Sequence, residues 1–129
     1  MAMQIREWTI PYLNYRTYYR SVGDPDSTKT PLLLLHGGPG STHSYFEVLD
    51  RLADEDGRQI ISYDQIGCGN SFLDGHPELW NMDTWLGELI AIRNALNLKE
   101  VITLGQSWGG ILLLEYVCRH DHTGVKGII

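Results

Sequence analysis

A serine with the surroundings of a nucleophile lies at position 107, in the centre of GQSWG, residues 105–109, which has the form G-x-S-x-G. The apolar run VITL at 101–104 precedes this segment and a longer apolar run follows it, which predicts a strand before the serine and a helix after it. A sharp strand-to-helix turn pushes the hydroxyl out of the sheet edge, and glycines flank it because side chains there would collide with the neighbouring strand and helix. We therefore predict that Ser107 is a nucleophile and not only a turn residue.

A second segment, HGGPG at 36–40, could stabilise the negative charge that forms on oxygen during acyl transfer. Each backbone N–H group aimed at that oxygen typically contributes about 3 kcal/mol to lowering the barrier. The Gly-Gly pair followed by Pro39 predicts an exposed, restricted loop that offers one donor, and the N–H of Trp108 would supply the other. The helix beginning at Trp108 adds a dipole that favours negative charge. We expect His36 to be a buried residue that fixes this loop, not the catalytic base.

A third glycine-rich loop, DQIGCGNS, occupies residues 64–71. The runs before the three loops, 32–36, 59–63 and 101–104, are continuously apolar, as expected of strands buried on both faces of a parallel sheet. Their loops would gather at the sheet edge where open α/β sheets bind ligands. Cys68 has no visible base beside it and is interpreted as a small packing residue.

The remaining segments predict the elements that position these loops. Residues 3–10 and 12–19, separated by Pro11, are expected to be two antiparallel strands near an edge, in a hairpin or meander, followed by a loop over 21–31. Two helices are predicted between the buried strands, a short one capped by Ser41 or Ser44 and a longer one capped by Asn81 or Asp83. Their apolar residues are Phe46, Val48, Leu49 and Leu52 in the first, and Trp85, Leu89, Ile92 and Leu96 in the second. The pattern predicts an α/β fold with a mostly parallel sheet and flanking helices.

LLLLHGGPGS, ISYDQIGCGNS and LGQSWGG, in this order and spacing, resemble the α/β-hydrolase fold and, within it, the proline iminopeptidase family of serine peptidases. The resemblance implies a serine hydrolase without metal or organic cofactor that releases an N-terminal residue, often proline, from small peptides, amides or arylamides. It also implies that Ser107 is the nucleophile, that the N–H groups of Gly38 and Trp108 form the oxyanion hole, and that Gly37 and Trp108 contact the substrate. Asp64 corresponds to a residue that shapes its loop and is not the triad acid.

The composition excludes several other classes of protein. The 129 residues carry a formal net charge of -6 without a basic stripe, which argues against a nucleic-acid partner. The longest aliphatic runs, such as LLLL at 32–35, are far shorter than the roughly 20 residues that cross a bilayer, so no membrane partner is expected. Arg6 and Glu7 interrupt the position of a secretory signal, which favours a cytoplasmic location. The two cysteines indicate neither a disulfide framework nor a metal site.

The catalytic acid and histidine of such a hydrolase follow the serine in the chain, but only 22 residues follow Ser107. His120, Asp121 and His122 come at the end of a helix about 18 Å long and should not reach the hydroxyl. Residues 124–129, GVKGII, are expected to begin another buried strand. We therefore expect residues 1–129 to be the N-terminal part of a single core domain, without the lid and the C-terminal strands.

Three functions remain open on the sequence alone. The first is an aminopeptidase or amidase whose acid and histidine come from chain outside these residues, so that the isolated chain is inactive. The second is an esterase or lactonase, because the serine machinery is shared. The third is a non-catalytic fragment that docks with a complementary C-terminal chain. Around the predicted site, His43 is expected to be a solvated loop residue, Trp85 a core residue, and Trp80 and Tyr45 possible borders of the pocket.

Overall fold

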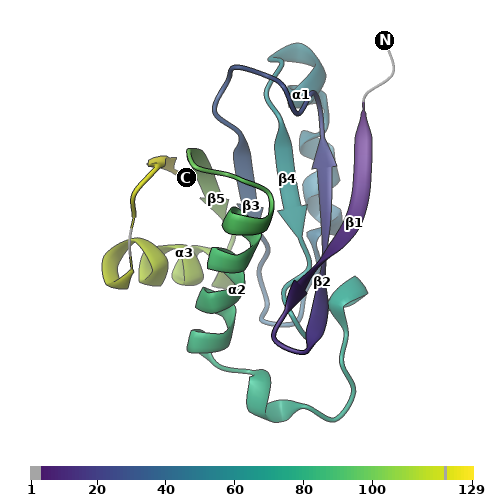
Figure 1. The fold of residues 1–129 in the computed structure, drawn as a ribbon, viewed down its shortest axis with the longest axis vertical. Helices are drawn as coiled ribbons and strands as arrows, with labels where there is room; N and C mark the ends of the chain where they lie inside the picture. Colours follow the sequence, from purple (N-terminus) through teal and green to yellow (C-terminus); the bar gives the residue numbers. More distant parts are fainter. Residues whose placement is uncertain (1–3, 121) are drawn as a thin grey trace.

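A computed structural model describes residues 4–120 and 122–129, and in these residues it contains one six-stranded sheet (Figure 1). The strands are β1 (Ile5–Tyr12), β2 (Tyr15–Val22), β3 (Leu32–Leu35), β4 (Ile60–Tyr63), β5 (Val101–Gly105) and β6 (Val125–Ile128). Their order across the sheet is β1-β2-β4-β3-β5-β6. Strands β4, β3, β5 and β6 are parallel, whereas β1 and β2 are antiparallel to their neighbours. This confirms the predicted mostly parallel sheet with N-terminal antiparallel strands.

The division between the first two strands differs from the prediction. Pro11 lies inside β1, paired with Arg16, and the chain turns at Leu13, which has a φ of 53°. Proline is tolerated here because β1 is the edge strand, where an N–H group can face away from the sheet. Strand β2 also continues through Val22, so the predicted loop is shorter at its N-terminal end.

The helices and short 3-10 segments lie on both faces of the sheet. Their bounds are η1 (His43–Leu49), α1 (Arg51–Glu55), η2 (Gly69–Ser71), η3 (Pro77–Leu79), α2 (Met82–Ala95) and α3 (Trp108–Arg119). In Figure 1, α2 crosses in front of the strands and α1 lies behind them. No helix in the described part of the chain is long and apolar enough to cross a membrane.

The core is divided between the two sheet faces by alternation along the strands. Leu33 and Leu35 pack with residues of α2 and α3, whereas Leu32 and Leu34 pack against Phe46 and Ala53 of η1 and α1. All four leucines of β3 are buried, as predicted for a central parallel strand. Because each buried leucine contributes roughly 2 kcal/mol, this strand is held firmly at the position from which the HGGPG loop leaves the sheet.

The long helix follows the prediction closely. Asn81 caps α2, its side-chain oxygen accepting a hydrogen bond from the N–H of Thr84 at 2.9 Å. Gly87, which lowers helix propensity, has a packing reason, because a Cβ there would lie 2.5 Å from the hydroxyl of Tyr12. That hydroxyl donates to the carbonyl of Thr84 at 2.6 Å, so the tyrosine is held against the helix.

The short helix differs from the prediction in type, cap and buried face. It is a 3-10 helix capped by Thr42, and not by either expected serine, followed by the five-residue α1. Phe46 is buried, but Val48 is 79% exposed and Leu52 is 39% exposed. A 3-10 helix has three residues per turn, so the residues facing the sheet are three apart and Val48 falls on the outer side.

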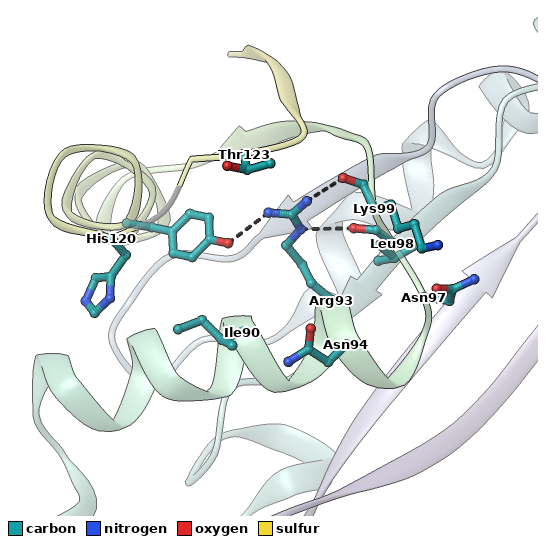
Figure 2. Close-up of a pocket in the computed structure, with 9 residues that line it drawn as sticks. Ile90, Arg93, Asn94, Asn97, Leu98, Lys99, His120 and Thr123 are labelled. Atoms are coloured by element: carbon teal, nitrogen blue, oxygen red, sulfur yellow. Dashed lines mark hydrogen bonds between the residues drawn. The ribbon is translucent and has the colours of Figure 1, made fainter.

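Arg93 joins the C-terminal ends of the two long helices at the edge of the sheet opposite the glycine-rich loops. Its guanidinium donates to the hydroxyl of Tyr116 on α3 and to the carbonyls of Leu98 and Lys99, which precede β5 (Figure 2). A pocket of about 630 Å³ lies beside this arginine. It is therefore at the wrong end of the strands to serve the predicted nucleophile.

The last strand lies at the edge of the sheet with its apolar residues partly exposed. Strand β6, residues 125–128, forms within the segment 124–129 where a strand is predicted, and Ile128 is 49% exposed. Ile111 and Leu114 on α3 are exposed as well. The apolar pattern predicts burial on both faces, whereas in the described residues no further element covers this side of the sheet.

Candidate active site

The three glycine-rich loops leave the sheet at one edge, because they follow the adjacent parallel strands β4, β3 and β5. Direct contacts join them. The N–H of Gln106 donates to the carbonyl of Leu35 at 3.2 Å, and the side chain of Gln65 reaches both other loops. The three loops therefore lie together at one edge of the sheet, as the sequence predicts.

Ser107 occupies a strained turn between β5 and α3. Its φ and ψ are 56° and −117°, a region that non-glycine residues rarely adopt, and the residue is exposed. The flanking glycines are required sterically: a Cβ on Gly105 would lie 2.5 Å from the carbonyl oxygen of Gly109, and one on Gly109 would lie 2.0 Å from that of Leu35. The turn thus presents the hydroxyl at the sheet edge beside the N-terminus of a twelve-residue helix.

The HGGPG loop lies against this turn. A Cβ on Gly37 would lie 2.5 Å from the side-chain oxygen of Gln106 and 3.3 Å from Cβ of Ser107. Gly38 has a φ of +124° and is exposed, so glycine is required by its backbone conformation. The peptide between Gly38 and Pro39 is cis. Gly37, Gly38, Ser107 and Trp108 are therefore brought to one place.

An outer brace joins the HGGPG loop to the serine turn. The N–H of Gly37 donates to the hydroxyl of Tyr45 at 2.6 Å, and this hydroxyl donates to the side-chain oxygen of Gln106 at 2.8 Å. Gly37 itself is buried. Its N–H is thus already engaged, which leaves the N–H groups of Gly38 and Trp108 as the candidate donors to a substrate oxygen.

His36 is fully buried and hydrogen-bonded at both ring nitrogens, as the sequence predicts. Nδ1 lies 2.8 Å from the carbonyl oxygen of Gly37, and Nε2 accepts from the N–H of Gln65 at 3.0 Å. Burial lowers its pKa, so the ring stays neutral and keeps Nε2 as an acceptor. His36 therefore fixes two loops and has no free nitrogen for proton transfer.

His43 is buried rather than solvated, contrary to the prediction. Its N–H and its Nδ1 both lie 2.8 Å from Oδ1 of Asp64, whose other oxygen accepts from the N–H of Asn70 at 2.9 Å. The sequence shows no partner for this histidine, because the aspartate is 21 residues away. Asp64 directly follows β4, which lies two strand spacings of about 4.8 Å each from β5, whereas His43 begins η1 after β3. The His–Asp pair shapes the third loop and does not supply the base for Ser107.

The other candidate proton carriers of the sequence lie away from the serine. His120 is at the C-terminal end of α3, about 18 Å from its start, and His122 follows it. Asp121 lies outside the described residues. Cys68 is buried, and burial raises the pKa of its thiol to about 11, which supports its interpretation as a packing residue. The described residues contain no group of three or more His, Cys, Asp or Glu side chains that could hold a metal ion.

Glu88 is a buried acid that sequence reasoning missed. It lies on the inner face of α2, where it accepts hydrogen bonds from the hydroxyl of Thr17 at 2.5 Å and from the N–H of Ile66. Burial raises its pKa to about 8. Glu88 lies three residues after Trp85 and four before Ile92, and this helical spacing places it on the apolar face of α2. The spacing could therefore have predicted that Glu88 is buried.

Glu88→Gln is expected to flatten the pH dependence of stability. Between pH 4.5 and 8 the folded chain holds a proton that the unfolded chain releases, so the free energy of unfolding of the wild type falls as pH rises through this window. The slope is at most about 1.4 kcal/mol per pH unit. Urea unfolding at pH 5, 6.5 and 8 would measure it. The exposed variant Glu100→Gln should keep the wild-type slope, and parallel curves for the wild type and Glu88→Gln would contradict the prediction.

Comparison with known proteins agrees with the α/β fold. Residues 30–129 match the family model of the alpha/beta hydrolase fold, so the chain belongs to that family. Within the family it is similar to the N-terminal part of proteins named proline iminopeptidase. The protein of that name from Clostridioides difficile (strain 630) is 57% identical over 127 residues, covering 98% of this chain and 43% of its own length. The one from Clostridium botulinum (strain Hall) is 55% identical with the same coverage.

Solved structures show the same relationship. The structure of VinJ matches with a TM-score of 0.87 and 37% identity over 95% of this chain and 42% of that one. The proline iminopeptidase of Mycobacterium smegmatis matches with a TM-score of 0.85 and 36% identity over the same shares. This chain therefore spans less than half the length of the relatives that it matches.

Proposed function

We propose that this chain carries the nucleophile and oxyanion hole of a serine hydrolase that acts on the N-terminal residue of small peptides, amides or arylamides. The observation that carries the proposal is the strained, exposed Ser107, which lies beside the Gly37–Gly38 loop and is flanked by Gly105 and Gly109, where a Cβ would collide with backbone atoms. In the reaction, Oγ of Ser107 would attack the substrate carbonyl while the N–H groups of Gly38 and Trp108 bind the oxyanion. The amine would leave and water would then hydrolyse the acyl-enzyme.

Proline is the proposed first residue of the substrate because the most similar relatives are named proline iminopeptidase. An esterase or lactonase would use the same serine and oxyanion donors, so these groups alone do not distinguish an aminopeptidase from an esterase or lactonase. The identity of 57% over 127 residues to a relative named proline iminopeptidase favours the aminopeptidase.

The acid and the histidine are proposed to come from residues beyond position 129. Among the described histidines, His36 and His43 are engaged in their loops, and His76 lies against Tyr15 and Glu78. His120 and His122 lie at and beyond the far end of α3. The exposed apolar residues of β6 and α3 are consistent with further chain packing on that side, so we propose that residues 1–129 are the N-terminal part of one core domain. The isolated chain is then expected to be nearly inactive, because a serine without its base loses several orders of magnitude in rate.

The test compares the 129-residue chain with a fusion of this chain to the remaining C-terminal part of the Clostridioides difficile relative. We expect the fusion to hydrolyse prolyl arylamides and to react with a fluorophosphonate, which forms a bond from Oγ of Ser107 to phosphorus and releases fluoride. The isolated chain should do neither at a comparable rate. Rapid turnover by the 129 residues alone would refute the missing-base proposal, and preference of the fusion for esters or lactones over prolyl arylamides would refute the aminopeptidase.

A further inference from the structure

Gln65 is a buried polar residue at which the three loops meet. Its side-chain Nε2 donates to the carbonyl oxygen of His36 at 2.9 Å, and its Oε1 accepts from the indole Nε1 of Trp108 at 3.0 Å. Its backbone N–H donates to Nε2 of His36 at 3.0 Å. Gln65 is fully buried, so these hydrogen bonds are shielded from competing water.

We propose that Gln65 is a positioning residue that holds the two oxyanion donors, the N–H groups of Gly38 and Trp108, at a fixed distance from each other. This inference rests on the proposed function. One partner of Gln65, His36, stands two residues before Gly38, and the other, Trp108, carries the second donor N–H itself. The glycine-rich HGGPG loop has few side chains of its own to fix it. The side chain of Gln65 therefore sets the distance between the HGGPG loop and the start of α3.

A neutral amide is the side chain that this position requires. It presents one donor to a carbonyl and one acceptor to an indole N–H, whereas a carboxylate offers acceptors only and an apolar side chain offers neither. The outer brace through Tyr45 and Gln106 joins the same two loops, but its hydrogen bond from Tyr45 to Gln106 is exposed and its bond from Gly37 to Tyr45 is only partly buried. The inner brace through Gln65 is buried, so its loss should disturb the donors more.

The first test uses nuclear magnetic resonance on the 129-residue chain and needs no catalytic activity. Trp108→Phe identifies the indole N–H resonance of Trp108 by its disappearance. In Gln65→Leu that N–H should exchange with solvent about tenfold faster, and the amide resonances of Gly38 and Trp108 should shift. Gln59→Leu is the matched control, because Gln59 donates one hydrogen bond to Ser21 far from the site, and it should leave all three signals unchanged.

The second test measures hydrolysis by the fusion described above. In Gln65→Leu, kcat should fall by about 10²-fold with little change in KM, because the donors bind the developing oxyanion and not the ground-state substrate. Gln65→Met keeps a side chain of similar length but offers neither the donor to His36 nor the acceptor for Trp108, so it should lower kcat about as much as Gln65→Leu does and shift the same resonances. A loss that was merely structural would lower kcat in parallel with the fraction of folded protein.

The results separate the inference from the function on which it rests. A fusion with the natural Gln65 that fails to react with the fluorophosphonate would overturn the proposed function. The amide resonances of Gly38 and Trp108 in the 129-residue chain would still show whether Gln65 positions these two N–H groups. Unchanged Gly38 and Trp108 amide signals in a folded Gln65→Leu chain would overturn the positioning role. If Gln65→Leu does not fold, an unshifted Gly38 amide in the better-fitting Gln65→Met would overturn it instead.

Discussion

Ser107→Ala in the fusion is expected to lower kcat/KM for a prolyl arylamide by at least about 10⁴-fold and to abolish labelling by a fluorophosphonate. The reason is that Ser107 is the proposed nucleophile, whereas the hydroxyl of Tyr45, which also joins the HGGPG loop to the serine turn, is held in hydrogen bonds with Gly37 and Gln106. Steady-state kinetics with a chromogenic arylamide would measure the loss, and the mass of the protein after labelling would show whether one phosphonyl group has been added.

The same substitution should leave stability nearly unchanged. Alanine keeps a Cβ at the φ of 56°, so the backbone strain remains, and the hydroxyl of Ser107 makes no capping hydrogen bond that would be lost. Ser44→Ala, which removes an exposed serine hydroxyl on η1, is the matched control and should keep both activity and labelling. Substantial turnover by Ser107→Ala, with no contaminating wild type, would show that another group is the nucleophile.

Gly109→Ala is expected to destabilise the chain by roughly 3 kcal/mol or more, enough to unfold much of a domain of this size. The new methyl group would lie 2.0 Å from the carbonyl oxygen of Leu35 and 2.7 Å from that of His36. Both oxygens belong to the backbone of the central strand and the loop after it, so neither can move without shifting the sheet or helix α3. Urea unfolding followed by circular dichroism would measure the effect.

The adjacent residue provides the control for this prediction. A Cβ on Gly110 would meet its nearest neighbour, the carbonyl oxygen of Gly105, at 3.5 Å, which is an ordinary contact. Gly110→Ala should therefore be neutral or stabilise the chain by up to about 1 kcal/mol, because alanine favours a helix more than glycine does. Equal unfolding midpoints for the two variants would show that α3 does not pack on β3 as closely as described here.

The sequence predicted the elements that depend on local patterns. Continuous apolar runs indicated β3 and β4, helical spacing and a capping residue indicated α2, and the G-x-S-x-G segment indicated the turn at Ser107. These features are readable because side-chain burial repeats with the period of each element and because glycine is required wherever two backbones approach closely. The same reasoning was wrong for η1, where a period of three residues replaced the helical one and exposed Val48.

Tertiary structure alone decided which distant residues meet. The hydrogen bond between Gln65 and Trp108 joins residues 43 positions apart, the contact of His43 with Asp64 spans 21 positions, and that of Thr17 with Glu88 spans 71. No local pattern encodes such pairs, because they depend on strand order and on the direction in which each loop leaves the sheet. The sequence by itself therefore determined the nucleophile turn and its glycine-rich loops as candidates, whereas the fold decided that Gln65 and Tyr45 brace them and that His43 belongs to the neighbouring loop.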